Sequence, residues 1–237
     1  MQLILRPYAL GAGLLYLLGT FFGIAAGLTG GETLTSIVTG GPLEGELLPL
    51  LSDGAFRLSA SALLTLGMGI SLVAMTVFFF PVLRRDSEPL ALGVLVFRGP
   101  LEGSAYLLLA LEQVALAVIG RHYRAGGDAA ALHAMGEVLY ELADLSGSLC
   151  TVVFLLGALC LYGSLYRTRL IPRWLSVWGG LGVVLYGAYG GLRFFGVDPS
   201  GATALQIPLA IQELVMGGWL VVVGFDRDAL ARLAPRG

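Results

Sequence analysis

Lysine is absent from this sequence of 237 residues, in which arginine supplies all 14 basic side chains. A chain without lysine is typical of a GC-rich bacterial genome. Charge of either sign is scarce, since 13% of the residues are charged, compared with roughly 25% in an ordinary soluble domain. The net charge of -2 excludes a strongly basic nucleic-acid-binding surface. We therefore expect no nucleic-acid partner.

Cysteine and histidine are also rare, with two residues of each. Cys150 and Cys160 lie in one apolar segment, and ten residues of helix separate them by about 15 Å, too far for a disulfide. His122 and His133 do not have the spacing of a zinc motif. The sequence thus predicts neither a metal site nor another cofactor.

Hydrophobic residues, by contrast, make up 57% of the chain and recur in long runs from end to end. A helix needs about 20 apolar residues to cross a bilayer core of about 30 Å. The runs predict an all-α integral membrane bundle of about six transmembrane helices, forming a single domain over residues 1–237. The first run is longer than the roughly 7 to 15 apolar residues of a signal peptide, so we expect a retained helix. The six predicted spans are residues 8–28, 58–80, 90–118, 142–166, 174–195 and 205–224.

The arginines predict the orientation of the helices, because cytoplasmic loops carry an excess of basic residues. If six helices alternate, both termini lie on the arginine-rich side, and we expect this side to be cytoplasmic in a multi-pass protein of the cell (inner) membrane. The external loops would then span residues 29–56 and 121–136. The arginine-rich side holds Arg6, Arg84, Arg85, Arg167, Arg169, Arg173, Arg227, Arg232 and Arg236, whereas Arg57, Arg121, Arg124 and Arg193 lie on or near the other.

Glycine is frequent, and Gly19, Gly23 and Gly27 recur every four residues on one face of the first predicted helix. Such a face lets a neighbouring helix approach closely, so that van der Waals contacts hold the two helices together in lipid. We favour packing within the monomer, and the alternative is a face that binds a protein partner.

Ionisable side chains at bilayer depth are the strongest functional indicators in such a sequence, because each costs about 2.5 to 3.5 kcal/mol to insert. Arg98 and Glu102 are four residues apart on the third helix, close enough to pair, and Pro100 between them is expected to kink the helix. Glu213, preceded by Gln212, lies near the middle of the sixth helix, at the depth expected for Glu102.

The fourth and fifth helices contribute further charges. Glu141 and Asp144 lie on one face of the fourth helix, and Arg193, near the external end of the fifth, is their natural partner. We expect a polar pocket for a ligand or a proton in the external half of the bundle. The alternative is a network of charges that only fixes the register of the helices. The candidate binding residues are Arg98, Glu102, Asp144, Arg193, Glu213, Glu141 and Gln212; no catalytic residue is predicted.

Four tyrosines reach the same region, and we interpret them as anchors at the membrane surface, the commoner role of tyrosine near helix ends. They are Tyr106, Tyr140, Tyr186 and Tyr189.

The segment LYRTRLIPRWLSVWG at residues 165–179 resembles the cytoplasmic turn of a bacterial multipass membrane protein family known as domain of unknown function 4386. The resemblance extends to Arg98 and Glu102, to Asp144, and to the pattern Pro208, Gln212, Glu213 with Gly224 and Phe225 at the end of the last helix. It spans most of the chain. It implies a six-helix membrane protein and supplies no activity.

Three classes of function are compatible with these features. Small-molecule or proton-linked transport or binding ranks first, because Glu102 and Glu213 lie beside helix-breaking prolines. A structural or partner-binding subunit of a membrane complex ranks second. An intramembrane enzyme ranks last, because the predicted spans contain no histidine and no serine nucleophile motif. Membrane lipid is the one partner that the composition itself implies.

The arginine bias leads to a test of topology. Reporter domains fused at either terminus, or inserted beside Arg84 or Arg169, should report a cytoplasmic location, because short arginine-rich loops stay on that side. A terminus found outside the cell would overturn the predicted orientation.

Overall fold

The structure, a computed structural model, describes residues 2–39, 46–197 and 203–233. This part of the chain is helical and contains no strand. Six of its helical segments are long and apolar enough to cross a membrane, which confirms the prediction of about six transmembrane helices. Glu44, expected in an external loop, and Arg236 lie outside the described residues.

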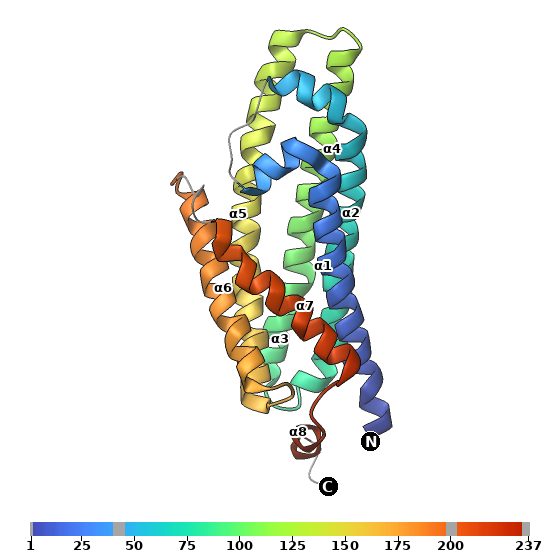
Figure 1. Cartoon of the computed structure of the whole chain (residues 1–237), viewed down its shortest axis with the longest axis vertical. Helices are drawn as coiled ribbons and strands as arrows, with labels where there is room; N and C mark the ends of the chain where they lie inside the picture. Colours follow the sequence, from blue (N-terminus) through green and yellow to red (C-terminus); the bar gives the residue numbers. More distant parts are fainter. Residues whose placement is uncertain (1, 40–45, 198–202, 234–237) are drawn as a thin grey trace.

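The helices follow the chain in a simple up-and-down order (Figure 1). The third span is not one regular helix, because a π-helical turn interrupts it between α3 and α4. The elements are α1 (Gln2–Thr39), α2 (Leu47–Leu83), α3 (Glu88–Val96), the π-turn η1 (Phe97–Leu101), α4 (Glu102–Arg124), α5 (Ala129–Thr168), α6 (Arg173–Phe194), the 3₁₀ turn η2 (Thr203–Gln206), α7 (Ile207–Val222) and α8 (Arg227–Arg232).

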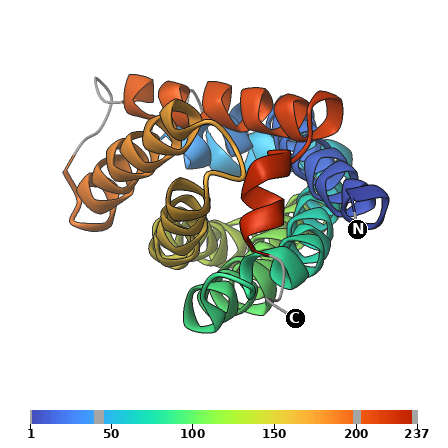
Figure 2. The ribbon, with the colours of Figure 1, turned by 90° about the horizontal axis from the view of Figure 1, so that it is seen from below.

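Neighbours in sequence are neighbours in space, and the helices form a closed ring. α1 packs against α2, α2 against the α3–α4 span, that span against α5, α5 against α6, and α6 against α7. α7 returns to α1 and closes the ring, crossing the bundle obliquely (Figures 1 and 2). The interior of this ring is where buried polar side chains can meet.

Arg6 connects the first helix of the ring, α1, to the last, α7. Its guanidinium donates to the carbonyl oxygens of Val221, Val222 and Val223 at 2.7 to 3.1 Å, and so caps the last turn of α7. The turns that carry Arg84 and Arg169 lie at the same end of the bundle, as does α8 (Figure 1). We call this end the arginine end.

The prediction of long loops at residues 29–56 and 121–136 is wrong, because most of their described residues are helical. α2 begins at Leu47, well inside the expected loop 29–56, and a turn of four residues at 125–128 replaces the expected loop 121–136. A kink at Gly31, with φ 68°, ends the regular part of α1, and Arg57 donates to the Thr29 carbonyl there. α5 has 40 residues, or about 60 Å of helix, twice the core of a bilayer.

A second hydrophobic cluster explains why these helices extend. Leu51, Leu116 and Ile119 are buried together with Ala143, so α2, α4 and α5 keep packing beyond the apolar runs. Asp128 then caps α5, its carboxylate accepting from the backbone N–H groups of Ala130 and Ala131. A hydropathy window detects bilayer-length runs and misses such helical extensions.

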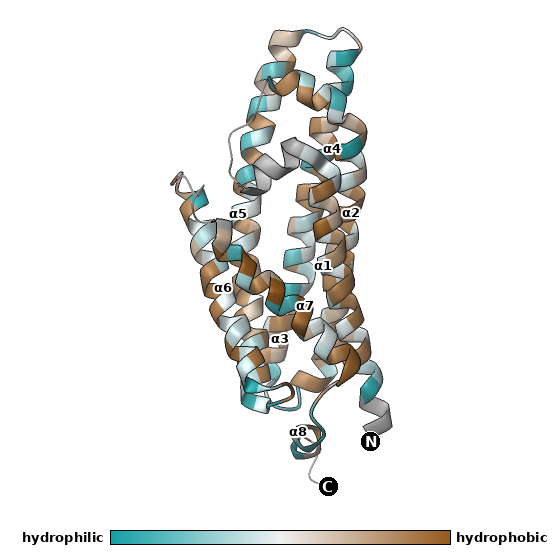
Figure 3. Ribbon diagram, viewed as in Figure 1, coloured by the Kyte–Doolittle hydropathy of each residue, from teal (hydrophilic) through white to brown (hydrophobic). Residues whose placement is uncertain are grey.

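Large apolar side chains on the outer surface of the ring account for the hydrophobic composition. Phe21, Leu63, Leu111 and Val184 are each more than half exposed, one on each of four spanning helices. Figure 3 shows hydrophobic residues along α1, α2 and α7 and hydrophilic ones gathered at the ends of the bundle. This distribution suits a surface in contact with lipid tails.

At Gly120, α4 approaches the backbone of α2 closely. A Cβ atom added there would lie 2.1 Å from the carbonyl oxygen of Leu51, which is backbone and cannot move aside. Gly120→Ala should therefore lower the free energy of unfolding by roughly 1 to 3 kcal/mol, the usual penalty for overpacking.

Gly180 in α6 is the matched control, since an added Cβ has nothing within 4 Å. Gly180→Ala should leave the melting temperature in detergent unchanged or slightly raised, because alanine is the better helix former. Equal melting temperatures for the two variants would contradict this packing.

Candidate functional site

The polar centre begins at the π-turn η1. Pro100 lacks a backbone donor, and Gly99 leaves helical geometry at φ −93° and ψ −109°, so the α-helical hydrogen-bond ladder is broken there. The break aims Arg98 into the bundle. Gly157 on α5 makes room for this side chain, since a Cβ there would lie 2.4 Å from Arg98 Cγ.

Arg98 and Glu102 form the buried ion pair that the spacing predicts. Arg98 Nη1 donates to Glu102 Oε1 at 3.0 Å, and the two side chains are 1% and 0% exposed. The guanidinium also lies 4.5 Å from the ring centre of Phe154 and 5.8 Å from that of Tyr16. These aromatic faces attract a cation, so Glu102, Phe154 and Tyr16 together stabilise the charge of Arg98.

Glu213 reaches the same centre from α7. Its Oε1 accepts from the Tyr16 hydroxyl at 2.9 Å, and a neutral phenol is the hydrogen-bond donor instead of a cation. Among the described residues Glu213 forms no ion pair. Glu213 and Glu102, which were predicted at a common depth, line one cavity together with Arg98.

Gln212 has a different part in the same network. Its Oε1 accepts from the Tyr162 hydroxyl at 2.6 Å, and its Nε2 donates to the Leu175 carbonyl at 3.1 Å. Tyr162 in turn lies 3.4 Å from the hydroxyl of Tyr16. Gln212 is 0% exposed, so it joins α7 to α5 and α6 instead of facing a ligand.

Two cavities meet around this centre. The inner chamber, of about 170 Å³, is lined by Arg98, Glu102 and Glu213 and by the rings of Tyr106, Phe154 and Tyr186. Arg98 is ten residues from the start of α3 at Glu88, or about 15 Å. This chamber therefore lies about half a bilayer core from the arginine end.

The outer chamber, of about 310 Å³, lies further from the arginine end. Its wall includes Gln113, Cys150, Thr151 and Arg193. Four residues line both chambers, namely Met68, Tyr106, Tyr186 and Gln206. The two cavities thus adjoin each other at these four residues.

Arg193 pairs with Asp144, one of its two predicted partners. Arg193 lines the outer chamber, whereas Asp144 lies outside its lining and is 32% exposed. Glu141 is in neither chamber. It lines a separate surface groove near the α4–α5 turn with His133 and Glu137. The predicted residues therefore fall into three groups. Arg98, Glu102, Glu213 and Gln212 belong to the polar centre, Arg193 and Asp144 form an ion pair at the outer chamber, and Glu141 lies in a separate groove.

Gly19, Gly23 and Gly27 face the interior and α2. A Cβ at Gly19 would meet Leu72 at 3.0 Å and one at Gly23 would meet Met68 at 2.8 Å, while Gly27 has open space. Gly19 lines the inner chamber and the other two line the outer one. Their missing side chains leave part of the chamber volume free.

The tyrosines are the main residues whose role the sequence missed. Tyr106 and Tyr186 line both chambers instead of anchoring the membrane surface. Tyr16 and Tyr162, buried to 1% and 3% exposure, form the hydroxyl contacts at the centre. The sequence feature that could have indicated this role is a tyrosine in the middle of an apolar run, far from either helix end.

Glu112 and Gln113 on α4 were also missed. Glu112 is 4% exposed and accepts from the Ser146 hydroxyl at 2.7 Å, and Gln113 donates to Thr65 at 3.1 Å. For Gln113 the signal is its position, since Tyr106, Leu109 and Gln113 follow Glu102 on one helical face and line the outer chamber. In the part of the chain that is described, no group of His, Cys, Asp and Glu side chains is arranged to hold a metal ion.

The closed ring of six apolar helices, with its charged interior, defines a helical multi-pass membrane protein. The chain belongs to the family described as Domain of unknown function (DUF4386), which matches residues 11–224. The resemblance noted from the sequence is thereby confirmed. No curated protein and no solved structure matches the chain.

The Arg98–Glu102 pair can be tested through stability. Arg98→Met leaves the Glu102 carboxylate buried without its cation, and should lower the free energy of unfolding by roughly 3 to 5 kcal/mol. Adding Glu102→Gln removes the orphaned charge, so the double variant should recover most of the loss. Thermal unfolding in detergent measures both. A double variant no more stable than Arg98→Met would contradict the pairing.

Proposed function

We propose that this protein binds a small organic cation in the two chambers and exchanges it for a proton carried by Glu213. The observation that supports the proposal is a count of charges. Two carboxylates, Glu102 and Glu213, share the inner chamber with one guanidinium, Arg98. An uncompensated charge at bilayer depth is costly. One further positive charge is needed, a proton when the chamber is empty and a ligand cation when it is occupied.

Glu213 is the better exchange group of the two acids. Glu102 is 0% exposed and bound to Arg98, whereas Glu213 is only partly buried and its donor is the neutral hydroxyl of Tyr16. A protonated Glu213 can donate to the Tyr16 oxygen, and Tyr16 can then turn its own proton toward Tyr162, 3.4 Å away. The same hydroxyls thus serve both protonation states without leaving a donor unpaired.

The walls favour a cation of modest size. Arg98 already occupies the face of Phe154, but the rings of Tyr106 and Tyr186 line the chamber as well, and aromatic faces attract ammonium groups. A volume of about 170 Å³ equals that of roughly five or six waters at ~30 Å³ each. It suits a small alkylammonium ion, and the outer chamber gives the path toward it.

We further infer that the protein lies in a bacterial cell membrane, with the arginine end in the cytoplasm. Support comes from the arginines of this end, where Arg84 and Arg169 follow the last residues of α2 and α5 and Arg6 binds the end of α7, as expected for the cytoplasmic side.

A structural or partner-binding subunit is the second candidate. It is favoured by the way Gln212, Tyr162 and Tyr16 join α1, α5, α6 and α7, because such a network stabilises a bundle without any ligand. Enzymatic activity has the least support, since no histidine is among the described residues that line either chamber.

Small ammonium ions are the probes for the proposed function. Methylammonium, trimethylammonium and tetramethylammonium should raise the melting temperature of the purified protein in detergent, whereas acetate should not. Calorimetry in buffers of different ionisation enthalpy should report up to one proton released per cation bound. Glu213→Gln should fold but lose both effects, because its amide cannot exchange a proton.

The control is Glu141→Gln, which removes a carboxylate from the same chain but from outside both chambers. It should behave like the wild type. If no ammonium ion binds, or if Glu213→Gln binds the ions with the same proton release, the exchange proposal fails. If the ammonium ions do not stabilise the wild type and Glu213→Gln has a higher melting temperature than the wild type, the structural alternative is supported instead.

A further inference from the structure

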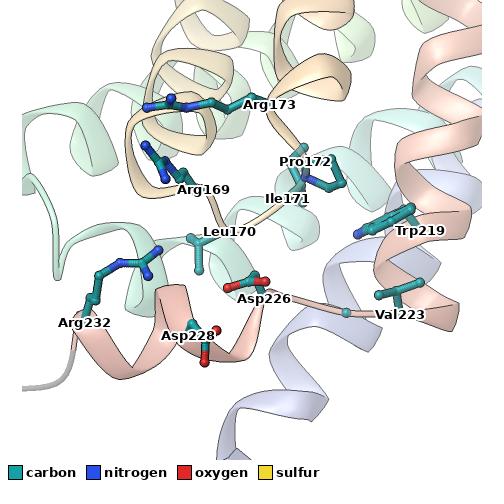
Figure 4. Close-up of a pocket in the computed structure, with 11 residues that line it drawn as sticks. Arg169, Leu170, Ile171, Pro172, Arg173, Trp219, Val223, Asp226, Asp228 and Arg232 are labelled. Carbon is teal, nitrogen blue, oxygen red and sulfur yellow. The ribbon is translucent and has the colours of Figure 1, made fainter.

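A separate cavity of about 470 Å³ opens at the arginine end, remote from both chambers. Three segments build it: the α5–α6 turn at 169–172, the last turn of α7, and α8. Figure 4 shows Arg169 and Arg173 side by side on one wall, with Arg232 reaching toward them from α8. Asp226, Asp228 and Trp219 complete the polar and aromatic lining.

The backbone that carries Arg169 is fixed in an unusual conformation. Arg169 ends α5 in the left-handed region, at φ 59°, where glycine is the favoured residue. The next two residues, Leu170 and Ile171, are 0% and 1% exposed, and the Leu170 carbonyl accepts from Asp226 N at 2.9 Å. The backbone of Arg169 is therefore fixed at the rim of the cavity, at a position suited to glycine.

The charges around this cavity are incompletely matched. Arg167, at the same end, pairs with Asp86, and Arg6 binds carbonyl oxygens of α7. In the described chain, by contrast, none of the three arginines of the cavity forms an ion pair; Arg173 lies 4.8 Å from the ring centre of Tyr166. One of the two carboxylates, Asp226, caps α8 by accepting from Ala229 N. Positive charge is left in excess.

Aromatic and apolar residues place this cavity at the level of lipid headgroups. Trp174 and Trp178 stack 6.2 Å apart in the first turns of α6, and Trp219 lines the cavity itself. Tryptophan gathers where a bilayer meets water. Val223, another lining residue, is 53% exposed, so the cavity adjoins surface that suits acyl chains.

We propose that this cavity binds the phosphate group of an anionic phospholipid. Arginine presents its donors in a planar fork that matches a phosphate, and basic pockets between helices at the cytoplasmic surface suit anionic headgroups. Arg169 and Arg173 flank the α5–α6 turn, whereas Arg232 lies far along the chain at the end of α8, so no continuous basic run reveals the three together. The site is independent of the cation exchange proposed for the chambers.

The test uses the full-length protein in detergent, titrated with phosphatidylglycerol, phosphatidylcholine or inorganic phosphate. The variant is Arg169→Gly/Arg173→Gln/Arg232→Gln, in which glycine suits the left-handed backbone. The control is Arg84→Gln/Arg85→Gln, which removes two arginines at the same end that do not line the cavity. Native mass spectrometry counts bound lipid, and thermal unfolding reports stabilisation.

Phosphatidylglycerol should bind the wild type and the control more tightly than phosphatidylcholine does. The triple variant should weaken this preference by about tenfold or more, since charge-assisted hydrogen bonds to the phosphate are lost. Equal preference in the triple variant and the control would overturn the site. Full stabilisation by inorganic phosphate alone would overturn the assignment to a lipid.

Discussion

The burial of Arg98 within the ring is the constraint on which the rest of the interior depends. A guanidinium at this depth needs a counter-ion and aromatic faces, and Glu102, Phe154 and Tyr16 supply them. The π-turn aims the side chain inward, and Gly157 leaves space for it. One pair is neutral by itself. The Arg98–Glu102 pair therefore leaves the negative charge of Glu213, on α7, without a compensating positive charge.

Much of this centre could be predicted from the sequence. Hydropathy revealed six spans, because the bilayer sets their minimum length. The spacing of four indicated the pairing of Arg98 and Glu102, and Asp144 was one of two partners expected for Arg193. Side-chain depth along a single helix is almost a matter of counting residues, so Glu102 and Glu213 were expected at one level.

The remainder depended on tertiary packing, which counting along a helix does not reveal. Most of the described residues in the predicted loops are helical because Leu51, Ile119 and Ala143 pack together from three helices. Tyr16 and Tyr162 gain a role only when α1 and α5 face α7. Glu141 was grouped with Asp144 by helical periodicity, yet Asp144 pairs with Arg193 at the wall of the outer chamber, whereas Glu141, about one turn away, lines another groove.

The proposed cation exchange depends on a proton on Glu213, which infrared difference spectroscopy detects most directly. Addition of tetramethylammonium to the wild-type protein should remove the carbonyl band of a protonated carboxylic acid, and a carboxylate band should appear. The acid band should be missing from Glu213→Gln. An acid band that persists in Glu213→Gln, or a wild-type spectrum without one, would contradict the proposed exchange.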